Sequence, residues 1–177
     1  DDHLLGDVRF GRALFDGMQG MGRLFQGAST VDAILRSDLI ERARDAGLRS
    51  VFIGFESLSE ANLRQSNKRQ NLDRSGESRR DYEAAIKRLD ELGVMINGSF
   101  VFGLDSDDRS VFKSTVDWAV QQGLTTATFH IATPYPGTAF HDEMERSGRM
   151  VHRDWRLYDT RHVVFQPRCM KAEELES

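Results

Sequence analysis

The sequence predicts an α/β fold in which helices alternate with parallel β-strands. Three segments with helical spacing of their apolar residues end at Gly47, Gly93 and Gly123, and a short apolar run follows each glycine. Glycine is common just after the last helical residue, and a short apolar run is typical of a strand that is buried on both faces. Because this alternation requires right-handed crossover connections, we expect the strands to be parallel.

The individual elements follow from local signals along the chain. Ser37 and Asp108 are suitable helix N-caps, and five apolar residues between Tyr82 and Leu92 recur at the helical period. The polar stretch 66–80 cannot bury itself and is expected to be a mobile loop. Helices are therefore expected over residues 6–20, 37–47, 60–65, 82–93, 108–123 and 139–146, and strands starting near residues 23, 50, 94 and 126.

Residues 149–177 are expected to form a trailing segment beyond the main unit, which spans residues 1–148. The helix–strand order weakens after residue 148, where 162–165 is a candidate final strand and Lys171 begins a helix. Because the end of the chain cuts this helix off and the sequence opens on Asp1 rather than Met, we expect a piece of a longer protein.

The composition favours a soluble globular protein and excludes several classes. Charged residues make up 29% and hydrophobic residues 39%, and no apolar run approaches the roughly 18 residues of a membrane span. The net charge of −4, with scattered basic residues, argues against a nucleic-acid surface. The single cysteine, Cys169, excludes an internal disulfide, and nothing suggests secretion, so we expect a cytoplasmic protein.

The strand that starts near residue 50 ends on two polar residues, Glu56 and Ser57. Ligands of parallel α/β sheets bind at the carboxyl ends of the strands, because the following loops converge there. A carboxylate at the tip of a buried strand is therefore a ligand candidate. The alternative is that Glu56 caps the next helix, but Ser59 is the better N-cap.

Four segments together carry a resemblance to a known family. They are Asp1-Asp2, FIGFESLSEANLRQSNK at 52–68, NGSFVFGLDSDD at 97–108 and HIATPYPGT at 130–138. In order and spacing they resemble the radical S-adenosylmethionine (radical SAM) family, in the group that often carries an upstream cobalamin-binding domain. The resemblance implies a partial, TIM-like (β/α) barrel with parallel strands. This chain would supply its carboxyl-terminal two-thirds, truncated at the N-terminus.

The same resemblance implies cofactors and an activity. The cofactors would be S-adenosylmethionine, a [4Fe–4S] cluster in the full-length protein, and cobalamin if an upstream domain binds it. The reaction would be of the iron–sulfur oxidoreductase or methyltransferase type on a small-molecule substrate, which the sequence does not identify. The C-x-x-x-C-x-x-C motif that holds the cluster is absent, and Cys169 cannot replace it. The chain alone is therefore expected to be inactive and to contribute the half of the barrel that binds S-adenosylmethionine.

The resemblance assigns cofactor-binding roles to residues on two sides of the nucleoside. Glu56, with Ser57 beside it, matches the residue that takes the ribose hydroxyls, and a carboxylate can accept two hydrogen bonds from a diol. Lys68 matches a basic residue that meets the methionine carboxylate, where relatives often have arginine. The alternative for Lys68 is a solvated charge in a polar loop.

The adenine side is assigned to two later strands. The family pattern G-x-I-x-G-x-x-E falls on Ser99, Val101, Gly103 and Ser106, of which the two serines depart from it. Apolar side chains and backbone would hold adenine there, although a plain buried strand that ends in a glycine turn explains the same residues. The last strand contributes the segment of Ile131, Thr133 and Pro134.

Several alternatives remain open. His130 lies within a strand and faces opposite to Ile131, so it is a substrate-facing candidate, as is Gln26. An aldolase or metal hydrolase would need a strand lysine or His and Asp at strand ends, and no predicted strand holds a lysine. A non-catalytic domain that binds a nucleoside or a partner protein is the other alternative. Unpaired edge strands would also permit a homodimer.

Overall fold

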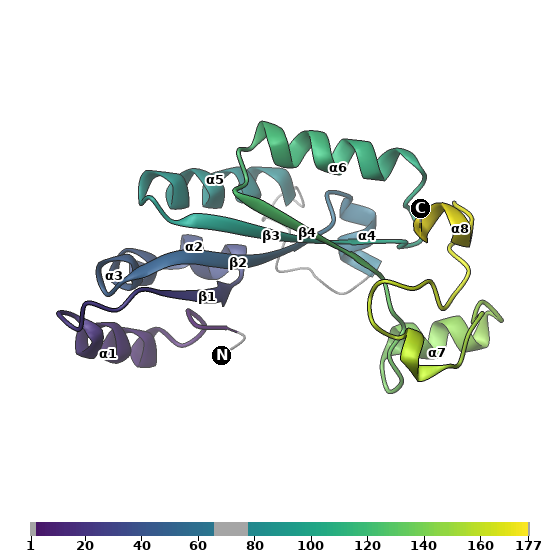
Figure 1. Ribbon diagram of the computed structural model, residues 1–177, viewed down its shortest axis with the longest axis horizontal. Coiled ribbons are helices and arrows are strands. Elements are labelled where there is room, and N and C mark those ends of the chain that lie inside the picture. The colour runs from purple at the N-terminus through teal and green to yellow at the C-terminus, as the bar shows by residue number, and fades with distance from the viewer. Residues whose placement is uncertain (1–2, 66–77, 177) are drawn as a thin grey trace.

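The computed structural model describes residues 3–65 and 78–176, and its centre is a four-stranded sheet (Figure 1). The strands are β1 (Phe25–Ser29), β2 (Leu48–Glu56), β3 (Met95–Phe102) and β4 (Thr126–Ile131). They lie in the order β1-β2-β3-β4, and each neighbouring pair is parallel. Sequential parallel strands joined through helices are the arrangement of β/α barrels. The predicted α/β fold with parallel strands is confirmed.

Helices fill the connections between the strands. In Figure 1, α5 and α6 run along the upper side of the sheet, and α1 lies below β1. The helices are α1 (Val8–Met18), α2 (Val31–Arg36), α3 (Leu39–Asp45), α4 (Glu60–Gln65), α5 (Ser78–Glu91), α6 (Ser110–Gln121), α7 (Ala139–Arg146) and α8 (Ala172–Glu176), with a 3₁₀ turn at Trp155–Leu157.

Apart from small shifts at helix ends, the described helices differ from the sequence prediction at α2 and at the start of α5. The helix α2 was not predicted, although Thr30 gives it an N-cap by accepting a hydrogen bond from the Ala33 backbone N–H at 3.3 Å. The short helix is stabilised by packing against α5 rather than by a long periodic pattern. The predicted loop over 66–80 is wrong at its end, because α5 already begins at Ser78. Residues 66–77 lie outside the described residues.

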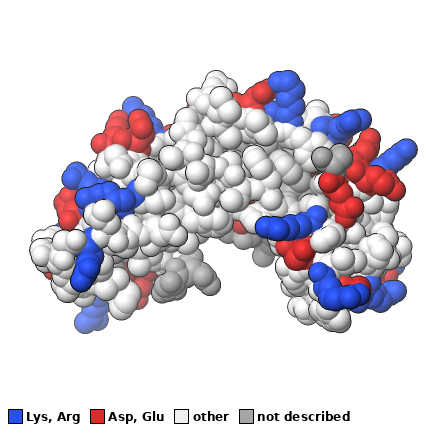
Figure 2. Space-filling model, in the orientation of Figure 1, with Lys and Arg blue, Asp and Glu red and all other residues white. Residues whose placement is uncertain are grey.

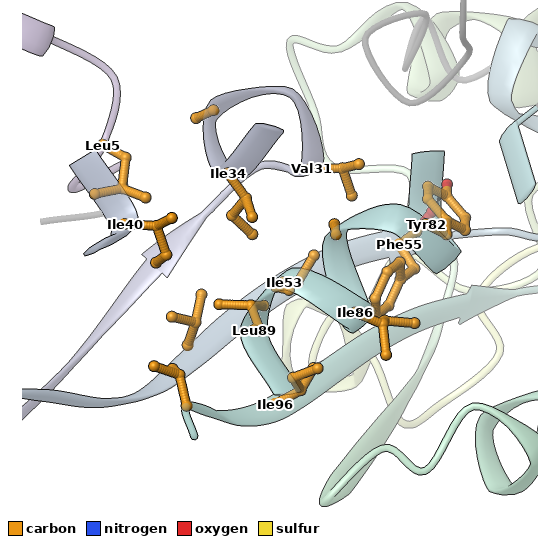
Figure 3. Packing of buried hydrophobic residues seen from close by; sticks show 14 of the residues in the cluster. Leu5, Val31, Ile34, Ile40, Ile53, Phe55, Tyr82, Ile86, Leu89 and Ile96 are labelled. Carbon is orange, nitrogen blue, oxygen red and sulfur yellow. Dashed lines mark hydrogen bonds between the residues drawn. The ribbon is translucent and has the colours of Figure 1, made fainter. Parts of the chain in front are cut away.

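The main core lies on one face of β2. Val51, Ile53 and Phe55 are at most 1% exposed. Figure 3 shows Ile53 and Phe55 beside Ile86 and Tyr82 of α5. The Phe55 ring centroid lies 4.8 Å from that of Tyr82 and 5.5 Å from that of Trp118. Full burial of one large apolar side chain contributes about 1.5–3 kcal/mol. This packing fixes β2 in place up to its last residues.

The opposite face of the sheet is more open and carries both large apolar side chains and small or polar ones. Phe52 and Met95 on this face are 40% and 51% exposed. The register places Ser99 beside Gly54 on β2 and beside Thr128 on β4. Figure 2 shows that charged side chains gather near the two ends of the molecule, and that the outline is hollowed between those ends.

The trailing segment packs on the sheet instead of extending it. Residues 162–165 do not form the predicted strand, and the only bridge there is an antiparallel one between Met150 and Phe165. The Asp159 carboxylate accepts hydrogen bonds from the backbone N–H groups of Arg161 and His162, which turns the chain before a strand can form. Val163, Val164 and Phe165 are nevertheless buried. The division of the chain after residue 148 stays a prediction.

Candidate functional site

The polar ends of β2, β3 and β4 lie at the same edge of the sheet. Glu56 is aligned with Phe100 on β3, and Phe102 is aligned with Ile131 on β4. The Ala132 backbone N–H continues this contact by donating to the Phe102 carbonyl at 2.8 Å. The structure therefore brings the predicted residues of all three strands to the carboxyl edge. Their role in binding stays a prediction.

Glu56 has a strained backbone conformation at the end of β2. Its φ angle is 66°, and the pairing with β3 shifts in register between Gly54 and Glu56. A left-handed conformation costs a residue other than glycine about 1–3 kcal/mol, and such strain clusters at functional sites. Glu56 is not the helix cap, because Ser59 Oγ accepts the hydrogen bond from the Asn62 backbone N–H at 3.4 Å.

The carboxylate of Glu56 occupies the space above Gly54. A Cβ atom built on Gly54 would lie 2.9 Å from Glu56 Oε1, so the missing side chain makes room for the carboxylate. Gly54 and Ser99 are register partners and share a face of the sheet. Glu56 is therefore folded back over the open face of the sheet, where a ligand can reach a half-buried carboxylate.

Hydrogen bonds from Tyr82 and Ser57 hold the backbone on both sides of Glu56. The Tyr82 hydroxyl donates to the Phe55 carbonyl at 2.6 Å and lies 3.3 Å from the Ser57 carbonyl. Ser57 is only 5% exposed, and its hydroxyl accepts from the Ser59 backbone N–H at 3.1 Å. Ser57 therefore shapes the loop next to Glu56, and its role in cofactor binding stays a prediction.

A buried polar pair that the sequence analysis missed joins the loops after β2 and β3. Asn62 on α4 is fully buried, Asp107 is 2% exposed, and Asn62 Nδ2 donates to Asp107 Oδ1 at 2.6 Å. Burial raises the pKa of Asp107 from 3.8 to about 6, and hydrogen bonds from Leu104, Asn62 and Gly103 oppose the rise. The available signal was the polar run at residues 105–108, of which only Ser106 and Asp108 were interpreted.

The predicted adenine residues on β3 lie in two environments. Ser99 is 6% exposed on the open face, beside Gly54. Val101 packs against the cluster that includes Met144 and Phe165, so later parts of the chain cover it. Gly103 has a φ of 94°, a conformation that favours glycine.

The end of β4 is engaged within the chain. The Ile131 backbone N–H donates to the Thr160 carbonyl at 2.8 Å, and the Thr133 hydroxyl donates to the Ile131 carbonyl at 3.0 Å. Pro134 is buried. A ligand that used the Ile131 N–H would therefore have to displace Thr160.

The weaker candidates lie away from Glu56. His130 Nδ1 is 3.2 Å from Thr160 Oγ1, and His130 lines a cavity of about 630 Å³ with Phe102, Phe129 and Ile131. Gln26 is exposed on β1 beside Ser50. Lys68 and the Asp1-Asp2 pair lie outside the described residues, and the role predicted for Lys68 stays a prediction.

The described residues offer no cluster of metal ligands. Among residues 3–65 and 78–176, no three His, Cys, Asp or Glu side chains converge as a metal site would require. Cys169 is exposed, with its Sγ 3.3 Å from the Asp105 carbonyl. None of the described helices combines the length and the hydropathy that crossing a membrane would need.

Several relatives of the chain are named methyltransferases, and two others are named magnesium-protoporphyrin IX monomethyl ester cyclases. The chain is 31% identical over 176 residues to bacteriochlorophyllide d C-12(1)-methyltransferase of Chlorobaculum tepidum, which covers 99% of the chain and 37% of that relative. It is 28% identical to the C-8(2)-methyltransferase of the same organism, over 72% of the chain and 27% of that relative. The chain thus spans about a third of the length of these curated relatives. No protein-family model matches it.

A solved structure shares the fold. It is the radical S-adenosylmethionine methyltransferase TsrM from Kitasatospora setae, described with cobalamin and a [4Fe–4S] cluster bound. The match has a TM-score of 0.63 and 15% identity, and it covers 83% of this chain and 29% of TsrM. A second TsrM structure, with tryptophan substrate and a SAM analogue bound, matches equally well.

Proposed function

We propose that this chain belongs to the radical S-adenosylmethionine superfamily and forms the part of such an enzyme that binds S-adenosylmethionine. The whole enzyme would be a methyltransferase that acts on a small molecule, the activity for which the bacteriochlorophyllide relatives are named. The proposal includes Glu56 as the acceptor for the ribose hydroxyls and the ends of β3 and β4 as the adenine side.

The observation that carries this proposal is the placement of Glu56. Its carboxylate is half-buried at the carboxyl edge of a parallel sheet, and its backbone has the left-handed conformation that, outside glycine, clusters at functional sites. A carboxylate is a good acceptor for two neighbouring hydroxyls, because it offers two oxygens in one plane. Gly54 and its register partner Ser99, on the same face of the sheet, are small and uncharged.

The residues fit the nucleoside but not the iron–sulfur cluster. One exposed cysteine cannot supply the thiolates of a [4Fe–4S] cluster, and no group of metal ligands converges among the described residues. The cluster ligands would therefore come from residues outside this sequence, as would the ligands of any cobalamin. What this chain would supply is the binding and orientation of S-adenosylmethionine.

Calorimetry with S-adenosylhomocysteine tests the ribose assignment. A hydrogen bond to a charged group contributes about 1.5–3 kcal/mol, so Glu56→Ala should weaken binding about 10- to 150-fold. Glu56→Gln keeps one acceptor oxygen and should lose less. Glu91→Ala is the matched control, because Glu91 ends α5 at the opposite edge of the sheet and its side chain is 64% exposed. Equal affinity of Glu56→Ala and wild type would refute the assignment.

A further inference from the structure

Asn62 and Asp107 form a buried bridge between the two loops that flank the proposed nucleoside site. Asn62 lies on α4, which follows the β2 loop, and Asp107 lies in the loop between β3 and α6. Polar groups that are buried this completely cost free energy unless they are hydrogen-bonded. Both side chains have such partners, and some of these partners lie on the opposite loop.

The orientation of the Asn62 amide is fixed by a backbone donor. Asn62 Oδ1 accepts from the Ser106 backbone N–H at 3.1 Å, and a backbone N–H can only donate. The Nδ2 group must therefore face the other side, where it donates to Asp107 Oδ1 at 2.6 Å. The Ser106 hydroxyl adds a second contact to Asn62 Oδ1 at 2.5 Å.

The other oxygen of Asp107 holds the turn after β3. Asp107 Oδ2 accepts from the Gly103 backbone N–H at 3.0 Å and from the Leu104 backbone N–H at 3.1 Å. Together with the Asn62 amide, three N–H groups therefore point at this carboxylate. An ionised carboxylate can accept all three hydrogen bonds, whereas a protonated one presents an O–H group to one of the donors.

Building on the proposed nucleoside site, we propose that ionised Asp107 is a positioning residue for nucleoside binding. Its carboxylate holds Gly103 and Leu104, on the adenine side, at a fixed distance from α4 and hence from the loop that carries Glu56. Asp107 does not contact the nucleoside in this arrangement. It acts by setting the separation of the two sides of the site, so its protonation should loosen them and weaken binding.

Among the carboxyl groups near this bridge, Asp107 has a pKa that lies in the pH range of ordinary binding experiments. Its pKa of about 6 lies within reach of ordinary buffers, and a cavity of about 190 Å³ lined by Asp107, Ser59 and Ser110 gives protons access. Asp108, also in that lining, stays ionised because hydrogen bonds from Ser110 hold its pKa below the ordinary value. Asp105 on the same loop is paired with Arg149 at 2.7 Å and Arg168 at 3.2 Å. The side chain that reaches Asp107 from α4 is the neutral Asn62.

The proposal predicts a pH profile for binding of S-adenosylhomocysteine. If only the ionised form binds well, the competent fraction near pH 5 is about one tenth, and affinity should fall about tenfold between pH 8 and pH 5. Asp107→Asn should bind more weakly than wild type at pH 8 and should lose this dependence. The reason is that the amide introduced at position 107 would direct an N–H group at one of the three donors that the carboxylate accepts from.

The double variant that exchanges the two side chains, Asn62→Asp with Asp107→Asn, is the matched rescue. It keeps one carboxylate and one amide in the bridge but swaps their positions. The carboxylate introduced at position 62 can accept from the Ser106 backbone N–H and from the new amide at position 107. Affinity at pH 8 should therefore recover relative to Asp107→Asn alone.

Two outcomes of these binding experiments would overturn the proposal. One is an Asp107→Asn protein that keeps the affinity and the pH profile of wild type. The other is an exchanged double variant that melts at the wild-type temperature but fails to recover affinity.

Hydrogen exchange separates this inference from the proposed function. Wild-type protein that binds no S-adenosylhomocysteine at any pH would refute the nucleoside site itself. The bridge is then tested by hydrogen exchange of the backbone amides of Gly103 and Leu104. After correction for the pH dependence of exchange in an unfolded peptide, these amides in wild type should lose protection at pH 5. In Asp107→Asn their protection should not depend on pH in this way. Unchanged protection of these amides would overturn the inference whatever the ligand does.

Discussion

The Glu56 carboxylate lies above Gly54, so close that a methyl group at position 54 would come within 2.9 Å of Glu56 Oε1. The two residues are separated by Phe55, whose side chain points into the core on the other face of the sheet. The shift in register between them turns Glu56 back over the strand. A side chain at position 54 and the observed carboxylate position are therefore mutually exclusive.

Gly54→Ala should displace the Glu56 carboxylate without unfolding the protein. Gly54 has no positive φ, so alanine fits its backbone, and the contact is with the mobile end of a side chain. If Glu56 binds the ribose, the affinity for S-adenosylhomocysteine should fall about tenfold, the equivalent of roughly 1.4 kcal/mol. Calorimetry and a thermal melt of the same sample check this. A melt that drops sharply would show that the space above Gly54 is needed for folding instead.

The strain at Glu56 should appear as a difference between two variants that both lack the carboxylate. Glycine adopts a φ of 66° freely, whereas alanine in a left-handed conformation costs about 1–2 kcal/mol. Glu56→Gly should therefore melt about 2–4 °C above Glu56→Ala, the shift that about 1 kcal/mol produces in a domain of this size. Both variants should bind S-adenosylhomocysteine equally weakly. Equal melting temperatures would indicate that the loop relaxes in the alanine variant.

The sequence was sufficient to predict the sheet because its signals are local and repeated. The glycines at 47, 93 and 123 all have positive φ angles, and each precedes a strand as predicted. The predicted boundaries of α4 and α7 are confirmed to the residue. Residues 162–165 were misjudged because an apolar run indicates burial, and burial here comes from packing beside Leu104 and Met170 rather than from pairing with a strand.

Of the candidate site, the sequence could predict only the residues at the carboxyl ends of the strands. Glu56 was identifiable because a charge after a buried strand has few structural explanations. The Asn62–Asp107 bridge was not identifiable, because the partners are 45 positions apart and each alone resembles an ordinary polar residue. The position of the Glu56 carboxylate over Gly54 was also beyond the sequence, since it depends on a positive φ at a residue that seldom adopts one.

Reconstitution with iron and sulfide should yield no stable [4Fe–4S] cluster on this chain. The only cysteine is Cys169, and a cluster of this kind requires several thiolate ligands. The measurement is visible absorbance of the thiolate–iron bands together with iron and sulfide analysis after desalting. A chelator-sensitive signal with about four irons per chain would contradict the prediction. Cys169→Ser is the control, because any adventitious iron on the lone thiol should vanish with it.

Asp107 should give opposite pH trends for stability and for ligand binding. Its pKa is raised from the ordinary 3.8 to about 6 in the fold, so the folded state binds the proton more tightly than the unfolded state. The stabilisation that follows is complete below about pH 4 and is lost as the pH rises through about 6. Relative to Asp107→Asn, wild type should therefore gain free energy of unfolding as the pH falls from about 7 to about 4, measured by urea denaturation at each pH.

Nucleoside binding should weaken over the same range, because protonation removes an acceptor from the bridge. The two trends together would mean that the fold keeps a charge that is unfavourable for stability because the site needs it. If stability and binding instead fell together with decreasing pH, the charged form would be the stable one, and burial would not dominate the pKa of Asp107.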